Sequence, residues 1–167
     1  MSPRVAAALE AVALRLHAAG IPFLLGGSGL LHALGVSVRV RDIDLVLRPE
    51  DGERLRAAAG AWWRSATTEA TPLLRSAWKA LLDVGGVEVE ALGGLAWAQD
   101  GAVVTMPFRT AGTWRCGEAE VALAPPEHWL LLYERYRPER AAQLAAALGA
   151  GARGAALAEL GLSAGAT

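Results

Sequence analysis

Apolar residues recur at three- and four-residue spacing along the first part of the chain. Between residues 3 and 19 the recurring positions are Val5, Leu9, Val12 and Leu16. This spacing is the period of a helix with one buried face, and Gly20 follows where a helix would end. We therefore predict a helix over residues 3–19.

The pattern then shortens to apolar runs separated by glycine. Residues 21–25 form a run rich in branched and aromatic side chains that ends at two glycines, which indicates a buried strand and a tight turn. Residues 28–34 predict a short helix. Residues 42–47 begin by alternating acidic and apolar positions, so we expect a strand with both acids on one face. Pro49 opens a further predicted helix that reaches about residue 61.

The second half of the chain predicts a hairpin, two more strands and a helical end. The hairpin spans residues 77–92 with its turn at 83–86, and the strands span 102–108 and 119–124. Helices are expected over 127–136, 138–148 and 155–160. Together these elements predict an α/β fold of the α+β type, with a short mixed sheet flanked by helices. We expect a single domain over residues 1–167, with a core at about 20–124 and C-terminal helices at about 125–161.

Composition and charge narrow the classes of function. Hydrophobic residues make up 53% of the chain and charged residues 20%, which is typical of a folded protein. The formal net charge of −1 argues against general DNA binding or coating of RNA. The chain shows neither a signal peptide nor an apolar stretch of about 20 residues, so we expect no membrane association. A single cysteine, Cys116, excludes an intrachain disulfide and favours a reducing compartment, the cytoplasm.

The turn at Gly26, Gly27 and Ser28 has the composition of a phosphate-binding turn. Two glycines allow the backbone to approach a bulky anion, and the following helix begins with free N–H groups at its positive end. The hydroxyl of Ser28 adds a donor. The turn is therefore suited to holding the phosphates of a nucleoside triphosphate.

Asp42 and Asp44 lie two positions apart on a predicted strand, so their carboxylates project from one face. Such oxygen ligands bind hard divalent cations. A third carboxylate from the hairpin, Glu90 or Glu88, would complete a site for one or two Mg²⁺ ions. Like charges about 4 Å apart repel by roughly 4 kcal/mol at an effective dielectric of 20, so this cluster should hold a metal or take up a proton.

Two arginines, Arg39 and Arg41, flank these aspartates. They either neutralise a phosphate or form salt bridges on a solvated surface. We assign Arg41 to the nucleotide-binding set and leave both interpretations open.

The order of these motifs resembles the signature of the nucleotidyltransferase-fold superfamily. Gly-Gly-Ser is followed after thirteen residues by Asp-Ile-Asp and an apolar run, as in small bacterial antibiotic nucleotidyltransferases and abortive-infection toxins. A further similarity is the segment from Pro126 to Tyr133, which is similar to the helix start common in these branches. The resemblance implies that Gly27 and Ser28 bind phosphate, that Asp42 and Asp44 bind metal, and that Glu90 is the third carboxylate.

The resemblance implies a Mg²⁺-dependent enzyme that moves a nucleoside monophosphate from a nucleoside triphosphate, such as ATP, to a hydroxyl on a small molecule, an RNA or a protein. The chain differs from the family at Val40, where Thr is frequent, at Tyr133, where Lys is frequent, and at Glu139–Arg140, where a Lys-Asp pair is frequent. Two rival hypotheses follow: a non-catalytic binding or regulatory protein on the same fold, and a toxin–antitoxin component acting on RNA or protein. A homodimer is one arrangement that would complete the acceptor pocket.

Overall fold

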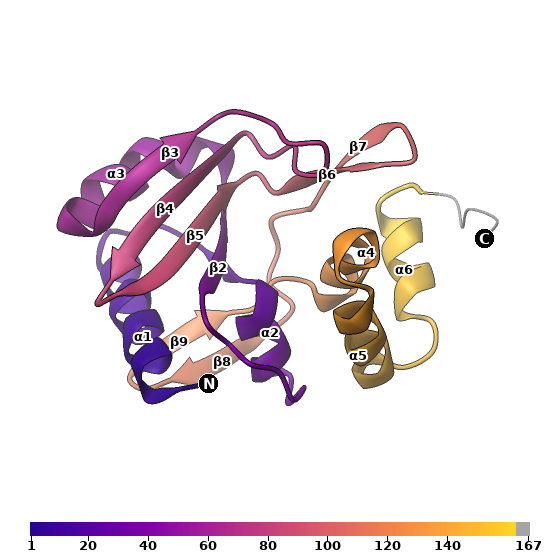
Figure 1. Ribbon diagram of the computed structural model, residues 1–167, viewed down its shortest axis with the longest axis horizontal. Coiled ribbons are helices and arrows are strands. Elements are labelled where there is room, and N and C mark those ends of the chain that lie inside the picture. Colours follow the sequence, from indigo (N-terminus) through magenta and orange to yellow (C-terminus); the bar gives the residue numbers. More distant parts are fainter. Residues whose placement is uncertain (163–167) are drawn as a thin grey trace.

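The structure is a computed structural model that describes residues 1–162. Its centre is a five-stranded mixed sheet in the order β1-β2-β5-β4-β3 (Figure 1). The bounds of these strands are β1 Leu24–Leu25, β2 Ile43–Leu47, β3 Trp63–Thr67, β4 Trp78–Val84 and β5 Val87–Gly93. Only the β2–β5 pair is parallel, and the other neighbours are antiparallel. This arrangement confirms the predicted mixed sheet of an α+β protein.

Helices cover the sheet and extend beside it. The helices are α1 Pro3–Ala18, α2 Gly27–Ala33, α3 Gly52–Ala59, α4 Pro126–Tyr136, α5 Pro138–Leu148 and α6 Ala152–Glu159, with 3-10 turns at Pro49–Asp51 and Gly60–Trp62. Helix α1 packs against α3, β4 and β5. Helices α4, α5 and α6 lie together beside the sheet, and α4 also contacts α2 (Figure 1). No helix within residues 1–162 is both long and apolar enough to cross a membrane.

Two small hairpins complete the fold. The first pairs β6 Ala96–Gln99 with β7 Ala102–Thr105, and the second pairs β8 Thr113–Cys116 with β9 Ala119–Ala122. The second hairpin packs against α1, and a bridge between Leu25 and Leu123 joins it to the main sheet. Strand β1 therefore has a neighbour on both sides, β2 on one and Leu123 on the other, and β2 lies between β1 and β5.

The predicted helices and the predicted β4–β5 hairpin are confirmed, with shifts of one to three residues at their ends. Two predicted strands were too long, and three strands were not predicted. The strand expected over 21–25 contains only Leu24–Leu25, because Gly20 to Phe23 follow the end of α1 without a ladder partner. The strand expected over 102–108 ends at Thr105. Strands β3, β6 and β8 were not predicted. Side chains of β3 are mostly exposed, so this edge strand lacks the apolar alternation that the sequence argument requires.

Candidate active site

The glycine turn joins β1 to α2 and lies directly against β2. The Gly26 N–H donates to the Asp44 carbonyl at 2.9 Å. Gly27 has a positive φ of 54°, and a Cβ atom there would overlap the Asp44 carboxylate. A Cβ atom on Gly26 would instead overlap the ring of Trp129 in α4. Both positions therefore require glycine because side chains of the protein itself fill the space beside them. From the sequence, we had explained the two glycines by the approach of a phosphate.

Asp44 is the centre of the predicted carboxylate cluster. Its Cα position is paired with that of Glu90 in the parallel β2–β5 ladder, and Asp42 lies one residue before β2. Burial raises the pKa of Asp44 to about 7, and the negative charges of Asp42 and Glu90 add to this effect. The structure thus brings together the three acids that the sequence selected, with Asp44 half-buried and Asp42 exposed.

Glu88 and Glu90, the two candidates for the third carboxylate, have different surroundings in the structure. Glu90 is half-buried beside Asp44, whereas Glu88 is exposed and paired in register with Asp83 of β4. Glu90 also forms an ion pair with Lys79 of β4. This lysine was not predicted to belong to the site, because the contact depends on the hairpin register.

Ser28 connects the turn to both aspartates. Its side chain is fully buried, and its hydroxyl donates to Asp42 Oδ1 at 3.5 Å. Its backbone N–H donates to the Asp44 carboxylate, a bond that lowers the pKa of Asp44 and partly offsets the effect of burial. The phosphate-binding serine proposed from the sequence therefore lies at the carboxylate cluster.

Arg140 and Tyr133 are site residues that the sequence argument treated only as departures from the family. The Arg140 guanidinium donates from Nη1 to the Tyr133 hydroxyl at 3.5 Å and lies 5.8 Å from the centre of the Tyr133 ring. The positive charge of Arg140 also lowers the pKa of Asp44. Burial raises the pKa of Tyr133 to about 12, so its hydroxyl stays protonated near neutral pH. One feature of the sequence could have indicated that Arg140 belongs to the site: it is a cation next to Glu139, the position at which the family frequently has Lys.

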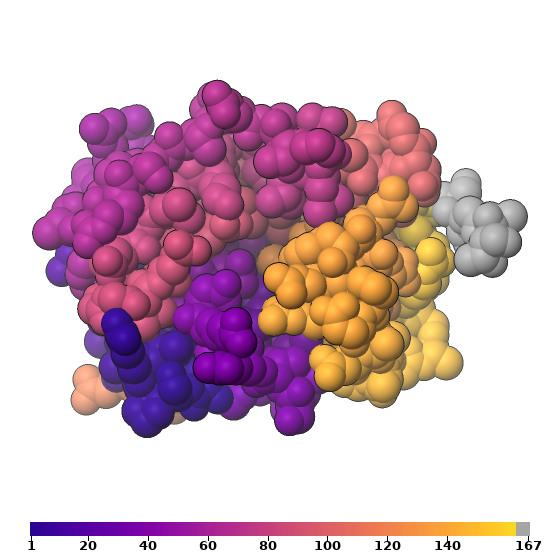
Figure 2. All heavy atoms as spheres, in the orientation of Figure 1, coloured from indigo at the N-terminus to yellow at the C-terminus, as the bar shows by residue number. Residues whose placement is uncertain are grey.

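A pocket of about 420 Å³ opens beside the cluster, between the segment before β2 and helix α5. Its charged lining residues are Arg39, Arg41, Asp42, Arg137, Glu139 and Arg140. In Figure 2 the α2–β2 segment (purple) lies between the N-terminal residues (indigo) and α5 (orange). The pocket lies where this segment meets α5. Four arginines against two acids give this pocket an excess of positive charge suited to a polyphosphate.

Arg39 and Arg41 are exposed residues of this segment. Within residues 1–162 neither of them forms an ion pair with a carboxylate; the ion pairs involve Arg54, Arg64, Lys79, Arg109, His128, Arg135 and Arg153. Of the two interpretations left open above, the structure therefore gives no support to surface salt bridges. Both guanidinium groups are available to bind an anion.

A second group of acidic and histidine side chains lies away from this site. Ligand atoms of Glu127, His128 and Glu159 lie within 4.8 Å of one another. Arg109 bonds both acids, with its Nη2 atom 2.7 Å from Glu127 Oε1 and 2.7 Å from Glu159 Oε2. Since the guanidinium already pairs with both carboxylates, this cluster is an ion-pair network that links α4, α6 and the loop before β8.

Comparison with solved structures identifies the fold. TM1012 of Thermotoga maritima, a nucleotidyltransferase candidate, aligns with a TM-score of 0.71 and 21% identity over 89% of this chain and 94% of its own. The antibiotic-resistance factor ANT(2'')-Ia aligns with a TM-score of 0.66 and 17% identity over 95% and 92% of the two chains. Its complex with adenylyl-2''-tobramycin gives 0.59 and 15% over 94% and 97%. No protein-family model and no curated protein matches the sequence. The chain has the nucleotidyltransferase fold, as the motifs predicted.

Proposed function

We propose that this protein is a Mg²⁺-dependent nucleotidyltransferase that moves a nucleoside monophosphate from a nucleoside triphosphate to a hydroxyl group. The observation that carries the proposal is the carboxylate cluster. Asp44 is held against Gly27, paired in register with Glu90 and close enough to Asp42 for the charges of both neighbours to raise its pKa. The likeness of the fold to known nucleotidyltransferases supports the same reaction class.

The donor set of this cluster fits Mg²⁺. Asp42, Asp44 and Glu90 offer carboxylate oxygens, which hard divalent cations prefer. The pKa of Asp44 is raised first by burial and then by the negative charges of Asp42 and Glu90, which a cation would neutralise. When bound there, Mg²⁺ would supply charge stabilisation at the phosphates of the nucleotide. We assign Asp42 and Asp44 as its ligands and Glu90 as the third ligand or the base.

The other residues of the site would bind and orient the nucleotide. Ser28 and the turn before it would contact the phosphates, and Arg41 and Arg140 would neutralise their charge from the pocket beside Asp42. In the reaction, the acceptor oxygen forms a bond to the α-phosphorus while the bond from that phosphorus to the bridging oxygen of the β-phosphate breaks. Pyrophosphate leaves, and the proton of the acceptor hydroxyl passes to a carboxylate of the cluster.

Isothermal titration with Mg²⁺ and each of the four nucleoside triphosphates tests this proposal. We expect binding by the wild type and its loss in Asp42→Ala/Asp44→Ala. Glu90→Gln should weaken binding by about tenfold or more, because removing a group that contacts a charged partner costs roughly 1.5–3 kcal/mol. Glu88→Gln makes the same charge change two residues away on an exposed side chain and should leave the affinity unchanged. If the folded wild type binds no nucleotide, the enzyme hypothesis is wrong.

One observation favours a second candidate, a nucleotide-binding protein without turnover. Lys79 already neutralises Glu90, so a carboxylate required as ligand or base is engaged by a cation of the protein. Pyrophosphate release distinguishes the two functions. Nucleotide binding without release of pyrophosphate from the bound triphosphate in the presence of any acceptor, in both the wild type and Lys79→Met, would support the binding protein.

A further inference from the structure

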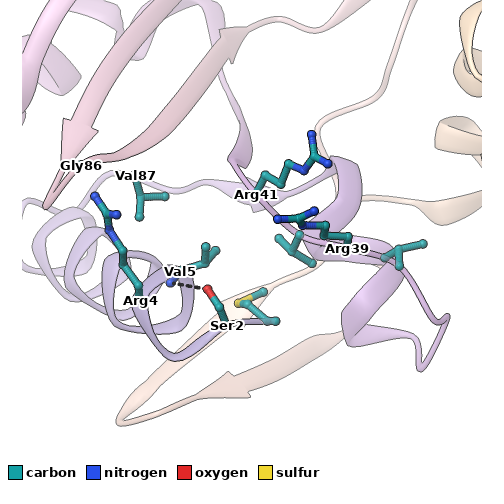
Figure 3. A pocket seen from close by; sticks show the side chains of 10 residues that line it. Ser2, Arg4, Val5, Arg39, Arg41, Gly86 and Val87 are labelled. Atoms are coloured by element: carbon teal, nitrogen blue, oxygen red, sulfur yellow. Dashed lines mark hydrogen bonds between the residues drawn. The ribbon is translucent and has the colours of Figure 1, made fainter.

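A second pocket lies on the other side of the segment that precedes β2. It has a volume of about 340 Å³ and is formed by the start of α1, residues 38–41 of this segment and the start of β5 (Figure 3). Its charged side chains are Arg4, Arg39 and Arg41, and no acidic residue lines it. Arg39 and Arg41 also line the pocket beside Asp42, so the two pockets share one wall.

The positive charge of this pocket is partly fixed in place. Arg4 donates from Nε and Nη2 to the Gly85 carbonyl at 3.1 and 2.9 Å, which holds its guanidinium at the mouth of the β4–β5 turn. Figure 3 shows Arg39 extending toward the side on which Arg4 lies, whereas Arg41 extends away from it. Within residues 1–162 none of these three arginines pairs with a carboxylate.

Arg4 and Arg39 therefore place two guanidinium groups at this pocket without an acidic partner. This arrangement is typical of phosphate binding, because the planar N–H donors match the geometry of phosphate oxygens. The pocket beside Asp42 is the one suited to the donor triphosphate, since it contains a metal-ligand candidate and Arg140. The second pocket is separated from it by the segment around Val40, which is buried. An anion in the second pocket would therefore belong to another molecule.

We propose that Arg4 and Arg39 of this pocket bind a phosphate group of the acceptor. The acceptor of nucleotidyl transfer is then a phosphate-bearing molecule, either a nucleotide or an RNA end. A cationic aminoglycoside would be repelled by the same two side chains. This inference rests on the proposed function, and it identifies the chemical class of the acceptor.

Titration with two probes tests the proposal and distinguishes the two sources of phosphate. The protein is first saturated with Mg²⁺ and an α,β-methylene nucleoside triphosphate, which cannot release pyrophosphate. It is then titrated with a nucleoside monophosphate, or with a short RNA oligonucleotide that has a free 3′-hydroxyl. We expect binding of at least one probe, weakening of about tenfold in Arg39→Gln, and a shallower dependence of affinity on salt concentration. The probe that binds more tightly identifies the source.

Three comparisons keep the outcomes separate. Arg75→Gln removes the same charge from an exposed arginine that lines neither pocket, and it should leave the affinity for the probe unchanged. Arg4→Gln, at a residue that lines the second pocket and not the pocket beside Asp42, should leave the affinity for the triphosphate analogue unchanged; an equal loss of triphosphate and probe affinity would mean that the second pocket belongs to the donor and would overturn the proposal. Equal probe binding by the wild type and Arg39→Gln, or preferential binding of tobramycin, would also overturn it.

The experiment also separates a failure of the proposed function from a failure of the proposed phosphate pocket. If the wild type binds no triphosphate analogue, nucleotidyl transfer is wrong, and the phosphate pocket is still tested by titrating the nucleotide-free protein with the same two probes. Arg4→Gln serves as a second variant, and circular dichroism reports whether it stays folded, because this change also removes the bonds to the Gly85 carbonyl.

Discussion

Gly26 and Gly27 are adjacent in the sequence, but a different neighbour fills the space beside each of them. Trp129 packs where a Cβ atom of Gly26 would lie, and the Asp44 carboxylate packs where that of Gly27 would lie. Gly26 has a φ of −116°, which any residue adopts, so a change at Gly26 tests packing alone. Gly27 combines the overlap with a positive φ.

Gly26→Ala should lower the free energy of unfolding by about 1–3 kcal/mol, as overpacked core substitutions do. Urea denaturation measures this change. In a Trp129→Leu background the cost of Gly26→Ala should be smaller by about 1 kcal/mol, because the ring that causes the overlap is gone. Gly154→Ala is the matched control: nothing lies within 4 Å of the added Cβ, and the helix should become more stable by up to about 1 kcal/mol. Equal costs of Gly26→Ala in both backgrounds would contradict the packing argument.

At the scale of residues, the sequence predicted what depends on local geometry. The period of a strand is sufficient to bring the carboxylates of Asp42 and Asp44 to one face, and the parallel neighbour Glu90 followed from the resemblance to the family. The contacts of Lys79 and Arg140 could not be predicted in this way. The first depends on the register of β4 with β5, and the second on the path of the chain between α4 and α5.

Helices α4 and α6 are joined by a charged network rather than by apolar contacts alone. Arg109 bonds Glu127 and Glu159, and Glu159 also lies 3.2 Å from His128 Nε2. His128 is fully buried, and its Nδ1 atom has no hydrogen-bond partner among the described residues. Burial lowers the pKa of His128 below its ordinary value of 6.5, despite the opposing influence of Glu159 and Glu127.

This shift gives the folded protein a pH dependence with a defined sign. Because the pKa of His128 is lower in the folded state than in the unfolded state, the unfolded state binds more protons below pH 6.5, and the contribution of His128 to stability decreases as pH falls. Asp44 acts in the opposite direction over the same pH range, so the test compares the wild type with His128→Gln, in which Asp44 is unchanged. In urea denaturation at pH 7.5 and 5.5, the wild type should lose about 1 kcal/mol relative to His128→Gln at the lower pH. Relative to His17→Gln, at an exposed histidine, it should show no such loss. An equal pH dependence of the wild type and His128→Gln would contradict the assignment.

Elements were predictable where their side chains alternate or repeat with a clear period. The amphipathic helices α1 and α5 and the hairpin β4–β5 show this period in the sequence. Strand β3 lies at an edge of the sheet with four exposed side chains, and β6 has buried side chains on both faces, so neither alternates like a half-buried strand.

The molecule as a whole brings four separate parts of the chain to one site. The turn at residues 26–28, the strands β2 and β5, and helix α5 each contribute a polar or charged group. The carboxylate cluster is unfavourable without a cation, since the raised pKa of Asp44 means that its charged form destabilises the folded state as pH rises through about 7. Under the proposed function, metal binding and stability would therefore oppose each other at Asp44.

Asp44→Asn should raise the stability of the metal-free protein at pH 8 by about 1 kcal/mol or more, because it removes a crowded negative charge while keeping the side chain's shape. The measurement is the melting temperature in EDTA and in millimolar Mg²⁺. Wild type should gain stability with Mg²⁺, and Asp44→Asn should not. Glu88→Gln, on the exposed neighbour, should behave like the wild type. If Asp44→Asn is less stable than the wild type in EDTA, the electrostatic argument is wrong.

The ion pair between Lys79 and Glu90 has a consequence for the proposed metal site. Lys79 serves as a resident counter-ion, so a metal that uses Glu90 would exchange with an ammonium group rather than fill an empty place. Such exchange would make metal affinity adjustable through the strength of one cross-strand contact. Under the proposed function, the pair would also keep Glu90 neutralised between product release and the arrival of the next metal–nucleotide complex.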